Sequence, residues 1–301
     1  MSAEAERSYD TVLLLGFGGP ESPEEIRPFL ARVLAGRPVP PERFRAVVEN
    51  YARIGGSSPY NALTRRLAAA LEAALRERGS DVPVRIAYRN TEPFLDDVMR
   101  ELKGRRVLAI PLATHEGEHA RDRYVRDCTD AARRAGNGGP AVDYTDPFFD
   151  EPRFVRAQAD RVRAACARLG AGAADAEVIF TAHSVPSEGS GRYASQFRRT
   201  AALIAEAAAA PRWSCAYQSR SGSPRDPWLG PDVRDVLREL PEHGIRHAVV
   251  APIGFLCDHV EVLFDLDVDA FEVARRAGVR MERAQTIGDH PDFVRMLAER
   301  V

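Results

Sequence analysis

Short apolar runs alternate with amphipathic helical patterns along most of the chain, and this alternation limits the possible folds more than any other feature. Runs of strand character fall at residues 11–17, 83–88, 105–112, 141–145, 177–184, 214–219, 246–253 and 279–284. Helical patterns fall at residues 63–78, 152–169, 192–209, 231–240, 260–277 and 291–301. Continuous apolar strands that alternate with helices are typical of parallel sheets covered on both faces. The chain is therefore predicted to be an α/β protein with two similar parallel sheets of roughly four strands each.

The length of 301 residues suits two domains, because single domains usually contain about 100–200 residues. We expect an N-terminal domain at residues 1–145 and a C-terminal domain at residues 146–290. A last helix at residues 291–301 is expected to pack back on the body of the protein.

Charge and hydropathy exclude several classes of protein. Lys and Arg number 42 and Asp and Glu number 44, so the net charge of −2 provides no overall basic field for nucleic acid. No apolar run approaches the roughly 18 residues that cross a bilayer. The start, MSAEAERSYD, has no apolar stretch behind a basic segment, and so no secretory signal. We expect a cytoplasmic protein, without a membrane span, that acts as a monomer.

The four cysteines, at positions 128, 166, 215 and 257, lie far apart and form no C-x-x-C pair. Without a secretory signal, neither a disulfide framework nor a thiolate metal cluster is expected. Each cysteine is interpreted as a small buried or half-buried apolar residue.

Ligands of parallel α/β sheets bind outside the carboxyl ends of the strands, so the residues after each strand are the candidates. The glycine-rich turn at residues 16–20 lacks both the G-x-G-x-x-G pattern and the lysine of a phosphate loop. It is interpreted as a loop that lets a flat ligand approach the backbone.

His115, Glu116 and His119 form an H-E-x-x-H pattern after the third strand. A zinc protease needs this pattern on a helix, whereas here it follows a strand directly and Gly117 interrupts any helix. A solvated polar loop is the favoured interpretation, and a weak surface metal patch or a metalloprotease are the alternatives.

Two later strand ends carry stronger candidates. His183 follows the fifth strand, and its imidazole titrates near neutral pH, so it could accept a proton or bind a metal. The alternative is a core histidine bonded to a backbone carbonyl. Glu261, Asp265 and Asp269 are spaced to form one acidic row on a helix, among apolar neighbours. Like charges at this spacing destabilise a helix by about 0.2–0.5 kcal/mol, so the row indicates either divalent cation traffic or a solvated face.

Several separate blocks of sequence together resemble ferrochelatases. These blocks are LLGFGGPESPEEIRPFL, YARIGGSSPYN, TAHSVP, YQSRSG followed by DPWLGPDV, and PIGFLCDHVEVLFDLD. The similarity runs from about residue 9 to about residue 293 and is closer to the bacterial coproporphyrin III ferrochelatases. The resemblance implies two Rossmann-like, chelatase-type domains with the active-site cleft between them. It implies a lyase of heme biosynthesis that inserts Fe2+ into a porphyrin, most simply coproporphyrin III to give coproheme, with release of two pyrrole protons.

The resemblance also implies roles for individual residues. His183 and Glu261 match the catalytic pair, and Asp258 and His259 match the two residues before that glutamate. The expected metal ligands are His183, Glu261, Asp265 and Asp269. The expected porphyrin contacts are Phe17, Ser58, Tyr124, Trp228, Ile26 and Leu30, of which Ser58 and Tyr124 would touch propionates.

The sequence also departs from the family pattern. Leu34, Ala35 and Asn50 stand where relatives often carry basic residues. The missing positive charge could come from Arg32, Arg37, Arg121 or Arg123. A paralogue with a changed metal or tetrapyrrole, and a non-catalytic heme carrier, are the alternatives.

Cofactor and partner expectations follow from the same resemblance. Fe2+ is expected as a substrate, with no tightly bound cofactor and no [2Fe-2S] cluster, because the cysteines of cluster-bearing relatives are missing. The apolar lip of the protoporphyrin enzymes is also missing, which favours the tetracarboxylate coproporphyrin. Other heme-pathway enzymes are possible partners.

Overall fold

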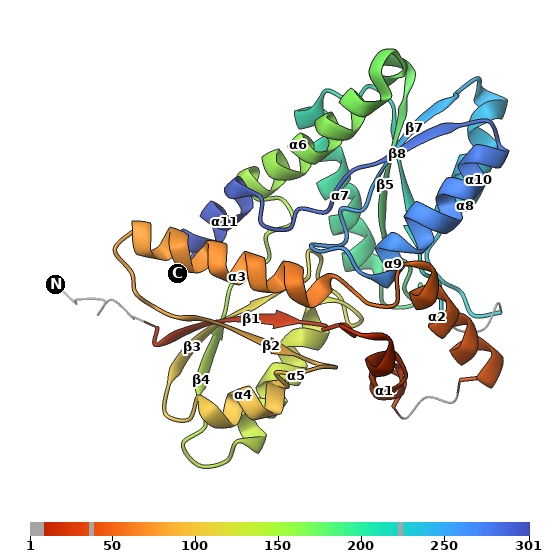
Figure 1. Cartoon of the computed structure of the whole chain (residues 1–301). Coiled ribbons are helices and arrows are strands. Elements are labelled where there is room, and N and C mark those ends of the chain that lie inside the picture. The colour runs from red at the N-terminus through yellow and green to blue at the C-terminus, as the bar shows by residue number, and fades with distance from the viewer. Residues whose placement is uncertain (1–8, 36–38, 222–224) are drawn as a thin grey trace.

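The computed structural model of the chain describes residues 9–35, 39–221 and 225–301, and its framework is a pair of four-stranded parallel sheets. Sheet A has the order β2-β1-β3-β4 and sheet B the order β6-β5-β7-β8, so the two sheets share one topology. Figure 1 shows the sheets as separate layers, each with helices on both faces. The predicted α/β fold with two parallel sheets is confirmed.

The two central strands of sheet A are buried because they are almost entirely apolar, whereas the edge strand at Ala141–Tyr144 is partly exposed. Its strands are β1 (Thr11–Gly16), β2 (Val84–Tyr88), β3 (Arg106–Pro111) and β4 (Ala141–Tyr144). Along β1, Val12 and Leu14 face one helical layer, whereas Leu13 and Leu15 face the other, as the alternation of side chains in a strand requires. The first layer contains α3 (Tyr60–Glu77), and the second contains α4 (Leu95–Glu101) and α5 (Arg121–Arg134).

Sheet B repeats this arrangement. Its strands are β5 (Glu177–His183), β6 (Trp213–Gln218), β7 (His247–Ala251) and β8 (Arg280–Arg283). One face packs on α6 (Pro152–Leu169) and α7 (Gly191–Ala208). The other face packs on α8 (Val233–Glu239), α9 (Val260–Leu263) and α10 (Phe271–Arg276). Phe180 faces the first layer and Ile179 the second.

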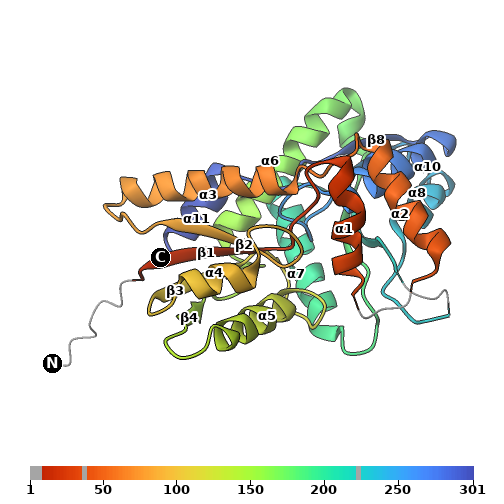
Figure 2. The ribbon, with the colours of Figure 1, turned by 60° about the horizontal axis from the view of Figure 1, so that its bottom comes forward.

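The helices α1 (Pro23–Val33) and α2 (Pro41–Arg53) follow the carboxyl end of β1. Figures 1 and 2 both show them on the side of the molecule where sheet B lies. Their buried side chains form a small core of their own, against which Phe17 and Val260 pack. Because Val260 precedes Glu261, this helical pair belongs to the surroundings of the candidate site.

The last helix, α11 (Pro291–Ala298), packs against α3 and α6. Phe293 and Leu297 are fully buried in the same cluster as Val12 and Leu14 of sheet A. Phe154 of α6 belongs to that cluster as well. The predicted domain boundaries at residues 145 and 290 stay predictions, because the core of sheet A draws on residues from both sides of them.

The eight predicted strands are confirmed to within two residues at each end. Helices α1, α2, α4 and α5 were not predicted from the sequence, and a single helix was predicted at 260–277. That segment instead contains α9, a π-helical turn at Asp265–Ala270, and α10. In the π turn the N–H of Asp269 donates to the carbonyl of Phe264, five residues earlier, at 2.9 Å.

Two further findings concern chemistry elsewhere in the chain. No helix in the described ranges is long and apolar enough to cross a membrane. All four cysteines lie within those ranges, and none of them is in a disulfide.

Candidate active site

His183 is the last residue of β5, so its ring lies at the carboxyl edge of sheet B. The side chain is 30% exposed. Its Nδ1 is hydrogen bonded to the carbonyl oxygen of Ser184. A carbonyl only accepts, so Nδ1 carries a proton and the neutral ring keeps its lone pair on Nε2. That nitrogen faces Glu261, with 3.5 Å between Nε2 and Oε1.

Glu261 lies in the first turn of α9, which begins soon after β7 ends. Its side chain is 40% exposed, and its backbone N–H donates to Nδ1 of His259 at 3.2 Å. Strands β5 and β7 are neighbours in sheet B. The fold therefore brings together two residues that are 78 positions apart in the sequence.

The two groups of this pair strengthen each other's charge. Burial by itself would lower the pKa of His183, but the facing Glu261 carboxylate outweighs burial and raises that pKa above its usual value. Burial would raise the pKa of Glu261, but the imidazole outweighs it and lowers that pKa to about 2. The carboxylate stays ionised at neutral pH and stabilises an imidazolium at position 183.

The predicted acidic row does not form a set of free carboxylates. Asp265 accepts a hydrogen bond from the Ser219 hydroxyl. Burial, and then the charge of Glu261, raise the pKa of Asp265 to about 7. Asp269 pairs with Nη1 of Arg234 at 2.9 Å, and that arginine also makes two 2.8 Å hydrogen bonds to Asp232. Within the described residues, no three His, Cys, Asp or Glu side chains gather closely enough to hold a metal ion.

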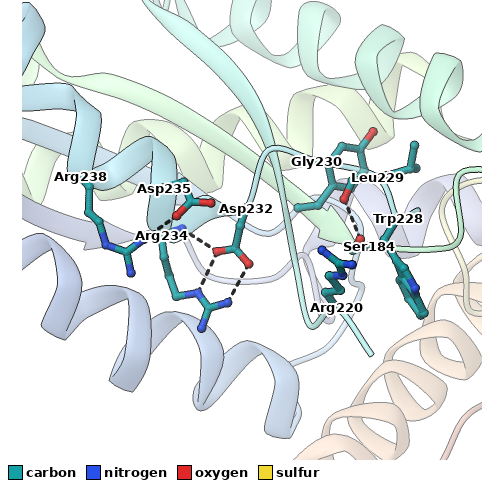
Figure 3. Close-up of a pocket in the computed structure, with 10 residues that line it drawn as sticks. Ser184, Arg220, Trp228, Leu229, Gly230, Asp232, Arg234, Asp235 and Arg238 are labelled. Carbon is teal, nitrogen blue, oxygen red and sulfur yellow. Dashed lines mark hydrogen bonds and ion pairs between the residues drawn. The ribbon is translucent and has the colours of Figure 1, made fainter. Parts of the chain in front are cut away.

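A cavity of about 420 Å³ lies near the carboxyl ends of β5 and β6. It is lined by Ser184, Tyr217, Arg220, Trp228, Leu229, Gly230, Asp232, Arg234, Asp235 and Arg238. Figure 3 shows the ion pairs of Asp232 and Asp235 on one side of this cavity, and Ser184 and Trp228 on the other. Ser184 follows His183 in the chain, but neither His183 nor Glu261 lines this cavity.

Phe17 and Tyr124, both predicted to contact a porphyrin, share one cation. The guanidinium of Arg89 lies 5.6 Å from the ring centre of Phe17 and 5.4 Å from that of Tyr124. Arg89 also pairs with Asp127 at 2.6 Å. Arg89 was not predicted to be a site residue, although it follows β2 directly and the strand-end rule that identified His183 applies to it equally.

Three other predicted porphyrin contacts are buried. Ile26 and Leu30 belong to the core between α1 and α2. Ser58 donates its N–H to the carbonyl of Pro20 at 2.7 Å, and its hydroxyl accepts from the N–H of Tyr60 at 3.3 Å. These residues support the segment that carries Phe17, and their own contact with a porphyrin stays a prediction.

The expectation of a solvated loop at His115 is wrong. The His115 side chain is 1% exposed, and its ring lies between Tyr193 and Phe197, with centroid distances of 5.6 and 5.7 Å. Its Nε2 is hydrogen bonded to the Thr200 hydroxyl at 3.2 Å, and burial lowers the pKa of His115 to about 3. His119 is exposed. No metal-holding group of three such side chains exists here or elsewhere among the described residues, and the loop is not helical, so the H-E-x-x-H pattern forms no zinc-protease site.

The four arginines that could replace the missing positive charge differ in the contacts they make. Nε of Arg32 donates to the carbonyl of Asn90 at 2.8 Å. Arg121 is buried and bonds the carbonyl of Thr145. Arg123 pairs with Asp127 at 3.0 Å. Arg37 lies outside the described residues.

Two parallel sheets of identical strand order, with a histidine and a carboxylate facing each other at a strand edge, define a chelatase-type α/β protein. Solved structures agree on the fold. CbiX, described as the terminal enzyme for siroheme biosynthesis in denitrifying bacteria, superposes with a TM-score of 0.57 at 21% identity, covering 96% of both chains. SirB from Bacillus subtilis superposes with a TM-score of 0.56 at 16% identity, covering 96% of this chain and 93% of its own.

Sequence comparison then narrows this class to one family. The family model described as Ferrochelatase matches residues 9–301. The ferrochelatase of Rhodopirellula baltica is 40% identical over 295 residues, which cover 96% of this chain and 84% of that protein. The coproporphyrin III ferrochelatase of Mycolicibacterium paratuberculosis is 42% identical over 299 residues, which cover 97% of this chain and 87% of that protein. The chain belongs to the ferrochelatase family, whose members are lyases of heme biosynthesis that insert iron into a porphyrin.

Proposed function

We propose that this ferrochelatase inserts Fe2+ into coproporphyrin III to give coproheme, with His183 and Glu261 as its catalytic residues. The observation that carries the proposal is the 3.5 Å approach of the His183 imidazole to the Glu261 carboxylate at the carboxyl edge of sheet B. Asp265 and Asp269 lie on the route by which the metal arrives. The cytoplasmic location and the monomeric state expected from the sequence belong to the same proposal.

The chemistry requires that two pyrrole N–H protons leave before four nitrogens can hold the metal. Since Nδ1 of His183 is occupied by the Ser184 carbonyl, its Nε2 is the atom that accepts a pyrrole proton. Glu261 stabilises the imidazolium that forms, because its carboxylate stays ionised. The second pyrrole proton passes to water, and the ionised Glu261 carboxylate hands the metal across.

Fe2+ must be held weakly, because it has to leave its protein ligands for the macrocycle. Carboxylate and imidazole bind Fe2+ with moderate affinity. The ion pair of Asp269 with Arg234 weakens the row further as a metal site, as does the readiness of Asp265 to hold a proton at neutral pH. Such a row passes a cation along without trapping it.

Two observations favour coproporphyrin over protoporphyrin. The relatives at 42% identity are named coproporphyrin III ferrochelatases. Among the described residues, the only exposed large apolar side chains are Trp213 and Phe271. Trp213 lies at the amino end of β6, opposite to the edge that carries His183. Phe271 is the first residue of α10, beyond the acidic row. The described residues thus expose few large apolar side chains, which suits a substrate with four carboxylates.

An anaerobic insertion assay tests the proposal. Purified protein is mixed with coproporphyrin III or protoporphyrin IX and with Fe2+, Co2+ or Zn2+, and insertion is followed by the change in porphyrin absorption. We expect kcat/KM to be highest for coproporphyrin III with Fe2+, by at least about tenfold over protoporphyrin, which corresponds to about 1.4 kcal/mol. A pH indicator should register two protons released for each porphyrin. Another preferred porphyrin or metal would show a paralogue, and tight product binding without proton release would show a carrier.

A further inference from the structure

Gln218 is a buried amide at the carboxyl end of β6, and its side chain connects two other segments. It is 1% exposed. Its Nε2 donates to the backbone carbonyl of Glu261 at 2.6 Å. Its Oε1 accepts from the Thr181 hydroxyl at 2.8 Å. The amide therefore ties the first turn of α9 to β5, two residues before His183.

The backbone of the same residue holds the other half of the pair. Gln218 lies directly opposite His183 in the register of β5 and β6. Its carbonyl accepts from the N–H of Ser184 at 2.8 Å, and Ser184 in turn supplies the carbonyl bonded to the His183 ring. One residue thus contacts the segment that presents His183 and the segment that presents Glu261.

The direction of the amide is determined by its partners. A backbone carbonyl only accepts, so the NH2 group must face Glu261 and the oxygen must face Thr181. A flipped amide would leave the Glu261 carbonyl without this donor and place two oxygens together in a buried site. The side chain therefore has one favourable arrangement in this position.

Glu261 needs such an external contact because its own helix is short. α9 has four residues and leads directly into the π turn, so few intrahelical bonds hold its first turn. Ser219, which follows Gln218, holds Asp265 in the next turn through its hydroxyl. The carboxyl end of β6 therefore anchors the two inner members of the acidic row.

We propose that Gln218 is a positioning residue that sets the distance between His183 and Glu261. This inference rests on the proposed catalytic roles of those two residues. Displacement of a catalytic group by about 1 Å can cost about 100-fold in rate. A change at Gln218 should therefore act on kcat through the pair while it leaves porphyrin binding unchanged.

The test substitutes Gln218→Met, which has a similar volume but no amide donor. We expect kcat to fall by about 10- to 100-fold, with KM for the porphyrin within about twofold of the wild-type value. Gln218→Glu keeps the acceptor for Thr181 but turns a second oxygen toward the Glu261 carbonyl, and it should lose at least as much. Thr181→Val removes only the other hydrogen bond and should lose less.

Gln196→Met is the matched control. Gln196 is also a buried, doubly bonded glutamine, but its amide bonds Glu116 and the N–H of the same residue, and neither member of the pair. It should retain wild-type kcat. Crystal structures of the wild type and of Gln218→Met give a readout independent of turnover, in which the distance from Nε2 of His183 to Oε1 of Glu261 should change in the variant.

An unchanged distance in Gln218→Met, or a kcat within about twofold of that of Gln196→Met, would overturn the inference. Should Gln218→Met not fold, Gln218→Glu is subjected to the same comparison. Failure of the proposed function has a different signature, because the wild-type protein itself would then not insert Fe2+ into coproporphyrin III. The crystallographic distance still decides the positioning role in that case.

Discussion

The two sheets have the same strand order, yet their strand-end histidines have opposite properties. His115, after β3 of sheet A, is buried against a neutral hydroxyl, and its pKa is lowered to about 3. His183, after β5 of sheet B, faces a carboxylate, and its pKa is raised. The strand end supplies a position for a side chain in both sheets. The partner that the neighbouring elements bring to that position decides whether the imidazole can exchange protons.

The carboxylates of the two halves differ in the same way. Glu116, next to His115, is held by the amide of Gln196 at 2.6 Å and by Arg192 at 3.3 Å. Glu261 faces an imidazole and keeps a 40% exposed side chain. The Glu116 carboxylate is thus held in structural contacts, whereas the Glu261 carboxylate is accessible to a substrate.

The largest effect is expected from removing the imidazole of sheet B. His183→Ala should lower kcat for iron insertion by about 10²–10⁴-fold, the usual loss when a general base is deleted, while the far-ultraviolet circular dichroism stays that of the wild type. His115→Gln, which changes the histidine that follows β3 of sheet A, is the control and should retain kcat. Normal turnover in His183→Ala would show that another group is the base.

Removing the carboxylate charge of Glu261 should be the next most damaging change. Glu261→Gln keeps the shape but no longer stabilises the imidazolium, so kcat should fall by about 100-fold. Since burial alone lowers the pKa of His183, that pKa should also fall, as measured by NMR titration of the ring. Glu116→Gln is the control in sheet A and should leave both quantities unchanged. A His183 pKa unaffected by Glu261→Gln would mean that the pair does not exist in solution.

His115, the buried histidine after β3, should affect the free energy of unfolding rather than kcat. The unfolded chain protonates His115 below about pH 6.5, whereas the folded protein does so only near pH 3. The unfolded state therefore binds more protons in this window, and the free energy of unfolding falls as pH falls. The contribution is about 1.4 kcal/mol for each pH unit. His115→Gln should reduce this slope in urea unfolding between pH 6 and about pH 4.

His119→Gln serves as the control, because His119 is exposed in the same loop. It should keep the acid sensitivity of the wild type. Equal slopes in wild type, His115→Gln and His119→Gln would place the His115 ring in water rather than in the core.

The smallest effect is expected at the outer end of the acidic row. Arg234→Gln removes the half-exposed guanidinium that pairs with both Asp269 and Asp232. Each such pair contributes about 1 kcal/mol or less, so the free energy of unfolding should fall by about 2 kcal/mol or less. The freed Asp269 should bind Fe2+ more readily, which would lower KM for Fe2+ by about twofold to fivefold, or about 0.4–1 kcal/mol. Arg238→Gln, which breaks a pair with Asp235 on the same helix, should leave that KM unchanged. Equal KM values for Fe2+ in the two variants would show that Arg234 has no effect on metal delivery.

Much of this architecture was predictable from the sequence, because buried parallel strands have continuous apolar sequences. The strand-end rule also located His183, and the acidic spacing after the seventh strand located Glu261. The resemblance to a family added the prediction that these two residues form the catalytic pair. The π turn was not predictable, because its five-residue hydrogen bond depends on how Asp265 and its neighbours pack against β6 and α8. The burial of His115 was not predictable either. The segment H-E-G-E-H is polar and was expected to be solvated, but Tyr193 and Phe197, on a helix that begins more than 70 positions later, enclose the ring.

The ion pairs could not be predicted from the sequence for a related reason. Arg234 reaches Asp269 across 35 positions and Arg89 reaches Asp127 across 38. A sequence of this composition offers many arginines and many acids, and only the packed elements select among them. For the same reason, the arginines proposed from the sequence to meet propionates are found in other contacts wherever the structure describes them.

The packing of α11 on sheet A has a consequence for how the protein is made. Val12 and Leu14 are synthesised well before Phe293 and Leu297, which share their cluster. Domains usually fold in order as they emerge during synthesis. Here the face of sheet A that packs on α3 does not complete its core until α6 and α11 have been synthesised. Part of that apolar face therefore stays uncovered while the residues between α3 and α11 are made, and it is the surface on which a nascent-chain chaperone would act.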